Sequence, residues 1–182
     1  MKASIVACIV VMALSPPAES AAGATPAASA PSGAVAREGK WSELVPPDWN
    51  PRRQFALAGL GAVRDGSPEA MQMLEEMRAA LNNAPTNPAI EGALLQLTGY
   101  VVPLDEVNGQ LTEFLLVPYF GACIHVPPPP SNQIVHVIID RPSKGIRSMD
   151  VVRVSGRLQS SRLDTDLGSS GYEMRGAAVD RP

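Results

Sequence analysis

The 182-residue chain carries a formal net charge of −3, and its basic residues form no cluster. Such a chain offers little to phosphate groups, which excludes nucleic acid as an expected partner. Aromatic residues make up only 4% of the chain, which also argues against broad platforms that stack bases or bind sugars.

The first 20 residues have the pattern of a secretory signal peptide. Lys2 precedes the apolar run ASIVACIVVMAL, which is too short to span a bilayer, and small residues follow it. Cleavage after Ser20 or after Ala22 fits this pattern, so we expect a periplasmic protein whose signal peptide contacts the membrane only during export. Cys8 lies in a loose lipobox, IVAC, but the apolar run continues past it. We therefore expect no lipid anchor at Cys8.

Removal of the signal peptide leaves Cys123 as the sole thiol, because Cys8 is removed with it. The mature chain can then form no internal disulfide. A single cysteine in an exported protein needs another explanation, either a chemical role or an inert, buried position.

Two segments precede the expected β-domain. Residues 21–40 are rich in Ala, Pro, Ser and Gly and are expected to form a flexible linker. Residues 41–92 are expected to form a helical and irregular strap, which Trp41, Leu44 and Trp49 could pin onto the domain.

One helix in the strap has clear boundary signals. Ser67 is a suitable N-cap, Pro68 suits the first helical position, and Asn82 and Asn83 end the pattern. The helix contains three methionines, Met71, Met73 and Met77. A methionine-rich copper tract is one interpretation, but the helical spacing favours a buried, core-packing face.

From Leu94 onward the pattern changes to β. Five strands are expected, at residues 94–104, 110–118, 132–140, 150–159 and 171–180. Asn108-Gly109 predicts a tight hairpin between the first two, and Gly99 and Gly156 are expected to mark bends or bulges. Short, bent strands with long interior connections favour a small closed barrel of the OB-fold type over residues 93–182, with a two-layer sandwich as the alternative. The predicted fold is thus mainly β, with an N-terminal α-helix and an irregular strap.

The segment GACIHVPPPPSNQ contains the strongest candidate for chemistry. In an extended backbone, the side chains of Cys123 and His125 point to the same side and could converge on one ion. The four prolines from Pro127 to Pro130 favour a stiff polyproline rod of roughly 12 Å, at about 3.1 Å per residue. Such a rod would preorganise the loop.

A metal site is one use of this pair, because Cys and His are natural ligands of zinc and copper. His136 on the next strand could be a third ligand, and Glu113 on the hairpin another. Pairing Val107 with Gln110 across the turn would place Glu113 opposite Leu104. Which face of that strand points inward stays open, because Leu111/Leu115 and Phe114/Leu116 compete for the core. An incomplete ligand set would suit metal transfer better than storage.

Other interpretations of Cys123 stay open. It could be a nucleophile with His125 or His136 as base, but a base two residues away on one strand is unusual, and the chain has no CxxC, GxSxG, HExxH or P-loop motif. We therefore predict no enzyme and no organic cofactor. Alternatively, Cys123 is inert and the prolines cover the barrel mouth or bind a partner protein.

Three stretches, GYVVPL, TEFLLVPYFGACIHVPPPPSNQIV and GYEM, together with the strap motif W-x-x-L-x-P, resemble a bacterial family of exported proteins, domain-of-unknown-function family 3299. The resemblance covers residues 41–180. It implies a periplasmic or lipid-anchored protein, and because genes of some members lie near those of MacB-like ABC transporters, an ABC transporter or another periplasmic protein is the expected partner. It also implies a site at Cys123 and His125. The following residues are then expected to orient the loop: Pro127, Pro128, Asn132 and Gln133. The resulting prediction is a metal-binding accessory or chaperone-like component of a transport system, with Zn(II) as first choice and Cu(I) as second.

Overall fold

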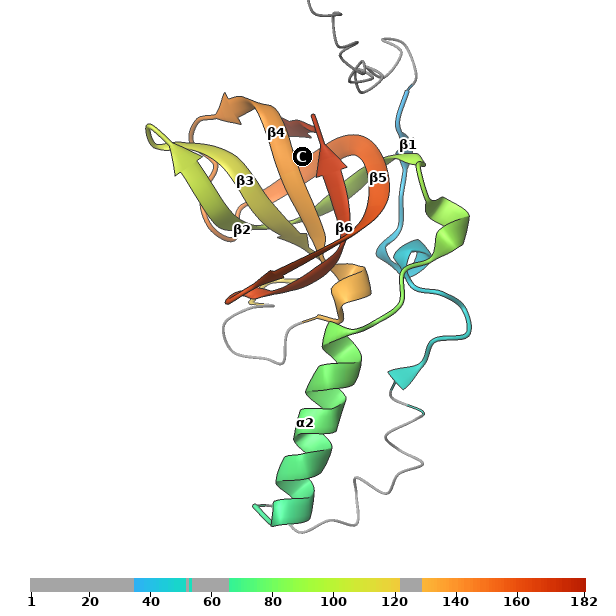
Figure 1. The fold of residues 1–182 in the computed structure, drawn as a ribbon. Helices are drawn as coiled ribbons and strands as arrows, with labels where there is room; N and C mark the ends of the chain where they lie inside the picture. Colours follow the sequence, from blue (N-terminus) through green and yellow to red (C-terminus); the bar gives the residue numbers. More distant parts are fainter. Residues whose placement is uncertain (1–34, 52, 54–65, 122–128) are drawn as a thin grey trace, which may run out of the picture. The chain divides into compact units, whose positions relative to one another are not determined.

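The computed structural model describes residues 35–51, 53, 66–121 and 129–182 (Figure 1). The predicted signal peptide and most of the predicted linker lie outside the described residues. Four predicted site residues also lie outside them: Cys123, His125, Pro127 and Pro128.

Five strands close into a barrel. They are β2 (Leu94–Val107), β3 (Gln110–Val117), β4 (Val135–Ser143), β5 (Val151–Thr165) and β6 (Gly168–Arg175). The order is β2-β3-β4-β6-β5, and a further β2–β5 pairing completes the circle. The β4–β6 pair is parallel and the other pairs are antiparallel. This arrangement confirms the predicted five-stranded, OB-like barrel and excludes the two-layer sandwich.

Two short strands extend the sheet. β1 (Arg37–Glu38) pairs with β2 in parallel, and β7 (Ala178–Asp180) pairs with β5 in antiparallel. β7 follows β6 along the same side of β5, so the two act as one interrupted strand.

The barrel interior is filled by alternate residues of the strands. On β4, Val135, Val137 and Ile139 belong to this core, whereas His136 lies on the opposite side of the strand. Side chains from outside the barrel strands complete the core, notably Leu44 and Ile90. A second, smaller hydrophobic cluster is formed by Val102, Leu115, Val117 and Ile134.

The predicted hairpin at Asn108-Gly109 is confirmed. Both residues have positive φ, 54° and 69°, and Val107 pairs with Gln110. These angles are those of a type I′ turn.

The register beyond this turn differs from the prediction. Glu113 pairs with Asp105 and not with Leu104, because the ladder shifts between Asp105 and Glu106. Such a bulge changes which residues face inward. Leu111, Phe114 and Leu116 therefore share the barrel core, while Leu115 joins the second cluster. The candidate pair Phe114/Leu116 thus lies in the barrel core, whereas Leu111 and Leu115 are split between the core and the second cluster.

The expected long interior connections are wrong for two of the links. β2 and β3 are joined by Asn108-Gly109, and β5 continues to Thr165, so that only Asp166 and Leu167 separate it from β6. These correspond to the loops that OB-folds use to bind oligonucleotides and oligosaccharides, and here each is only two residues long. The β3–β4 connection is long. It ends in a 3-10 helix, η4 (Ser131–Gln133).

The strap is attached to the barrel as predicted at Trp41 and Leu44. Both lie in a 3-10 helix, η1 (Trp41–Leu44). The indole Nε1 of Trp41 donates a 2.8 Å hydrogen bond to the carbonyl oxygen of Thr98, and Leu44 is fully buried. Trp49 is only half-buried and does not belong to the core cluster. A second turn of the strap, η3 (Pro88–Ile90), buries Ile90.

Helix α2 (Pro68–Asn82) begins and ends where the sequence predicts. The hydroxyl of Ser67 accepts a 3.1 Å hydrogen bond from the backbone N–H of Ala70. The expected core-packing face is wrong, because no residue of α2 is buried and Met71 is 62% exposed. The reason is that strand and strap side chains already fill the barrel. No described helix combines the length and the hydropathy needed to cross a bilayer.

Candidate functional site

Two ionisable side chains are buried side by side on the wall of the barrel. His136 on β4 and Glu173 on β6 are direct partners in the parallel ladder, and only 5% and 7% of them are exposed. Their neighbours Val135, Val137, Tyr172 and Met174 point to the barrel core. The strict alternation of the two strands therefore places the imidazole and the carboxylate together on the other face.

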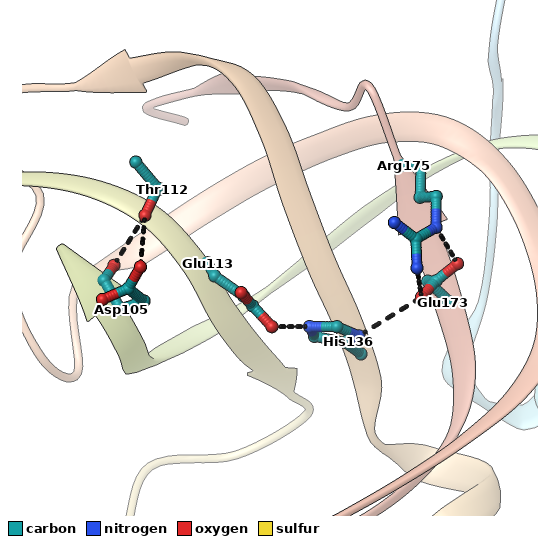
Figure 2. Close-up of polar contacts among 6 residues, drawn as sticks. All are labelled: Asp105, Thr112, Glu113, His136, Glu173 and Arg175. Carbon is teal, nitrogen blue, oxygen red and sulfur yellow. Dashed lines mark hydrogen bonds and ion pairs between the residues drawn. The ribbon is translucent and has the colours of Figure 1, made fainter. Parts of the chain in front are cut away.

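Each ring nitrogen of His136 faces a carboxylate (Figure 2). The Nε2 atom lies 2.5 Å from Oε1 of Glu113, and the Nδ1 atom lies 3.5 Å from Oε2 of Glu173. Glu113 is brought here by β3, which lies next to β4 in the sheet. Its side chain is 34% exposed, so this end of the chain of contacts reaches solvent.

Arg175 lies at the other end of this row of contacts. Its Nε and Nη2 atoms donate hydrogen bonds of 2.6 and 2.9 Å to the two carboxylate oxygens of Glu173. The two residues are two apart on β6 and share one face, which permits this bidentate contact. Glu173 is therefore held by the guanidinium on one side and faces the imidazole on the other. We call these four residues, Glu113, His136, Glu173 and Arg175, the polar wall cluster.

Acidic and basic side chains alternate along the row of contacts in the polar wall cluster. A neutral imidazole has one N–H, so it can donate to only one of its two carboxylates, whereas an imidazolium can donate to both. With His136 as imidazolium, the two carboxylates and the two cations sum to zero. With neutral His136, one negative charge is left over, and a bound cation could balance it.

The cluster brings together two of the predicted metal ligands, His136 and Glu113. A metal-binding histidine commonly directs its other ring nitrogen to a carboxylate, and Glu173 stands in that position beside Nδ1. Within the described part of the chain, no group of three or more His, Cys, Asp or Glu side chains is arranged to hold a metal ion. The described residues thus offer at most two metal ligands, His136 and Glu113, with Glu173 placed to orient the ring of His136.

The predicted loop-orienting residues Asn132 and Gln133 lie in η4, where the β3–β4 connection returns to the barrel. Asn132 is fully buried, and its Nδ2 donates a 2.9 Å hydrogen bond to the carbonyl oxygen of Pro85. Ser131 beside it donates to the carbonyl oxygen of Ala84 at 3.2 Å. The backbone N–H of Gln133 donates to Pro130 at 2.7 Å. Both side-chain bonds fix the end of the connection to the strap.

Sequence reasoning missed Glu173 and Arg175. The local signal was present, because Glu173 and Arg175 alternate with Tyr172 and Met174 in GYEMRG. Their alignment with His136 depends on the parallel β4–β6 pairing, which joins residues far apart in the sequence.

The model of the family described as "Protein of unknown function (DUF3299)" matches residues 41–181. The chain is also similar to the crystal structure of a DUF3299 family protein from Pseudomonas aeruginosa PAO1. The sequence identity is 36%, the match covers 80% of this chain and 95% of that chain, and the TM-score is 0.61. No curated protein matches the sequence. The matched range includes the strap and all five barrel strands, and the chain therefore belongs to the DUF3299 family.

Proposed function

We propose that this protein is a non-catalytic metal-binding protein of the bacterial periplasm that serves a transport system. Its metal is Zn(II), with Cu(I) as the second choice, and its ligands are Cys123 and His125 together with His136 and Glu113. The observation that carries the proposal is the direct contact of His136 with Glu113 on β4 and β3. These are the two strands that the segment with Cys123 and His125 connects.

The positions of the strands support this assignment. His136 pairs with Leu115, which lies two residues before the end of β3 at Val117. η4 ends at Gln133, three residues before His136. The connection therefore leaves and rejoins the barrel within a few residues of the polar wall cluster.

The chemistry of the cluster also supports it. A thiolate, two imidazoles and a carboxylate form a donor set that suits zinc, whereas the thiolate and imidazoles also suit Cu(I). Glu173, which Arg175 holds in place, would orient the imidazole of His136 through Nδ1. Metal binding at Nε2 requires that nitrogen to be unprotonated and the carboxylate of Glu113 to move back so that the metal can lie between the two side chains, which the partial exposure of Glu113 permits.

The test is a competition titration of the reduced, tag-free protein with Zn(II) and Cu(I). We expect submicromolar affinity for one of the metals and a loss of at least about tenfold in Cys123→Ser, His125→Ala and His136→Gln, since each loses a ligand. Asp105→Asn is the matched control, because Asp105 pairs with Glu113 across the hairpin but has no proposed role. Its affinity should equal that of wild type.

Proton release gives a second measurement. Binding of Cys123 as a thiolate must expel the proton of its thiol, so calorimetry in buffers of different ionisation enthalpy should show proton release on binding. Wild-type binding no tighter than micromolar, or unchanged affinity in both Cys123→Ser and His125→Ala, would contradict the proposal. The periplasmic setting is tested separately, by fractionating cells that express the full-length chain.

A further inference from the structure

A pocket lies where the barrel wall opens between β4 and β7. The ladder between β4 and β6 ends at the pair Ile138 and Arg175, but β4 continues to Ser143 without a ladder to β7. A pocket of about 460 Å³ is lined by residues 139–144 on one side and 176–179 on the other. This volume is in the range of sites for small molecules.

Hydrogen bonds hold both ends of this opening. At one end the backbone N–H of Ala177 donates to the carbonyl oxygen of Ile138 at 3.3 Å. Beyond the other end, Nη2 of Arg181 donates a 2.5 Å hydrogen bond to the carbonyl oxygen of Gly145. The two strand segments are therefore fixed relative to each other, and the opening is a built feature of the barrel.

The floor of the pocket is apolar. Ile139 and Ala177 belong to the barrel core and are each only 7% exposed, and Val179 packs against that core. A ligand that fills the pocket can thus place hydrocarbon against these three side chains and gain from the removal of apolar surface from water.

The rim of the pocket carries an excess of positive charge. Arg141 and Lys144 line it and are exposed, and no carboxylate among the described residues forms an ion pair with either of them. Asp140 is the one acidic residue of the lining, and its Oδ2 lies close to Gly176, 3.0 Å from where a Cβ would stand. Two cations and one carboxylate leave the lining with one net positive charge.

We propose that this pocket binds a small organic acid. Its carboxylate lies at Arg141 and Lys144, where charge-assisted hydrogen bonds are available, and its hydrocarbon part lies against Ile139, Ala177 and Val179. The site uses none of the residues proposed for metal binding, so the two functions can be tested independently.

The test is a titration of the isotope-labelled, full-length protein followed by amide chemical shifts. Hexanoate is the probe, 1-hexanol supplies the same tail without the charge, and inorganic phosphate supplies charge without the tail. We expect saturable shifts with hexanoate at residues 139–144 and 176–179. We expect 1-hexanol and phosphate to bind at least about tenfold more weakly, which corresponds to about 1.4 kcal/mol.

Two double variants distinguish the effect of the charges at the pocket from the effect of the overall charge of the protein. Arg141→Gln/Lys144→Gln should weaken hexanoate binding at least about tenfold. Arg53→Gln/Arg78→Gln changes the net charge equally at exposed positions that do not line the pocket and should bind like wild type. Thermal unfolding of each variant verifies that it is folded. The proposal is overturned if hexanoate does not bind below about 10 mM, if 1-hexanol or phosphate binds as tightly, or if the first double variant retains wild-type affinity.

Discussion

The phenolic hydroxyl of Tyr172 on β6 donates a 2.7 Å hydrogen bond to the carbonyl oxygen of Leu44 in η1. The same hydroxyl accepts a hydrogen bond from the backbone N–H of Asn87, and Nδ2 of Asn87 donates to the carbonyl oxygen of Glu43 at 2.8 Å. One buried side chain therefore ties two separate parts of the strap to the barrel. The strap completes the barrel core and is held to it by polar contacts as well as by Leu44.

Replacement of Tyr172 by phenylalanine should lower the free energy of unfolding by about 1–3 kcal/mol, because the carbonyl of Leu44 and the N–H of Asn87 both lose a buried partner. Urea denaturation measures this change. Tyr100→Phe is the matched control, because Tyr100 is only half-buried, contacts Phe120 through its ring and should change stability by less than about 0.5 kcal/mol. Equal effects of the two variants would show that the hydroxyl of Tyr172 does not hold the strap.

Tyr172 should also make stability sensitive to alkaline pH. Burial raises the pKa of its hydroxyl above 10.0, against the opposing effect of the hydrogen bond from Asn87. The folded state then retains this proton after the unfolded state has lost it, so the contribution is complete below about pH 10 and is lost as pH rises through the folded-state pKa. Wild type should lose stability more steeply than Tyr172→Phe above pH 10. Parallel pH profiles would contradict this.

Gly99 on β2 should not tolerate a side chain. A Cβ at this position would lie 2.7 Å from the carbonyl oxygen of Val117 and 3.0 Å from the ring of Trp41. Gly99→Ala should therefore destabilise the protein by about 1–3 kcal/mol in urea denaturation. Gly156→Ala is the comparison, because a Cβ at this position would meet its nearest atoms, the Cβ atoms of Met174 and Ala177 and the sulfur of Met174, at the longer distances of 3.3–3.4 Å. A larger loss for Gly156→Ala would contradict the packing argument.

Loss of the α2 cap should act locally. Ser67→Ala removes the acceptor for the N–H of Ala70 and should cost the helix about 1 kcal/mol, which is about a fivefold faster exchange of amides in its first turns. The urea midpoint should stay unchanged, because α2 contributes no buried residue. Ser67→Asp restores an acceptor and should restore slow exchange. A fall in the global midpoint with Ser67→Ala would show that α2 unfolds together with the barrel.

The pKa of Glu69 provides a second, independent measurement of the cap that Ser67 forms on α2. Its own backbone N–H and then the hydroxyl of Ser67 hold this pKa below 4.5. The lowered pKa stabilises the helix above this value, and that contribution is lost as pH falls through the folded-state pKa. Ser67→Ala should raise the pKa of Glu69 in a carboxyl-carbon NMR titration, because the second of these two causes is removed. An unchanged value would mean that Ser67 does not contact Glu69.

Local sequence signals predicted those parts of the fold that depend on local chemistry. The cap at Ser67, the turn at Asn108-Gly109 and the alternation of the strands each follow from a few neighbouring residues. At Gly99 and Gly156 the sequence predicts bends or bulges in the strands. Neither lies at a register shift, and the need for glycine at Gly99 arises from Trp41 and β3 approaching it, which sequence neighbours do not reveal.

The candidate site depended more on long-range pairing. Glu113 and His136 could be named from the residue types, but the position of Glu113 depends on a register shift in the hairpin, which pairs Glu113 with Asp105 instead of Leu104. Glu173 joins them only because β4 and β6 run parallel, which follows from closure of the barrel. Helix α2, which has no buried residue and exposes Met71, shows the converse limit, because a helical period does not reveal whether another element covers that face.

The contact between Glu113 and His136 should be measurable as an energetic coupling. In a double-mutant cycle of Glu113→Gln and His136→Gln, followed by urea denaturation at pH 7, we expect a coupling free energy of about 0.5–3 kcal/mol, since His136 is almost fully buried and Glu173 holds its other nitrogen. Arg162 and Asp164 provide the matched control cycle. They form a close ion pair within one strand, at 2.7 Å, but both are exposed.

The control cycle should give a coupling of about 0–1 kcal/mol, because solvent and salt screen an exposed pair. Raising the ionic strength should then reduce the Arg162–Asp164 coupling more than the Glu113–His136 coupling, which lies further from solvent. A Glu113–His136 coupling no larger than that of the control pair, with the same salt dependence, would show that the polar wall cluster does not hold the imidazole in place. The proposed orientation of His136 toward a metal would then lose its structural basis.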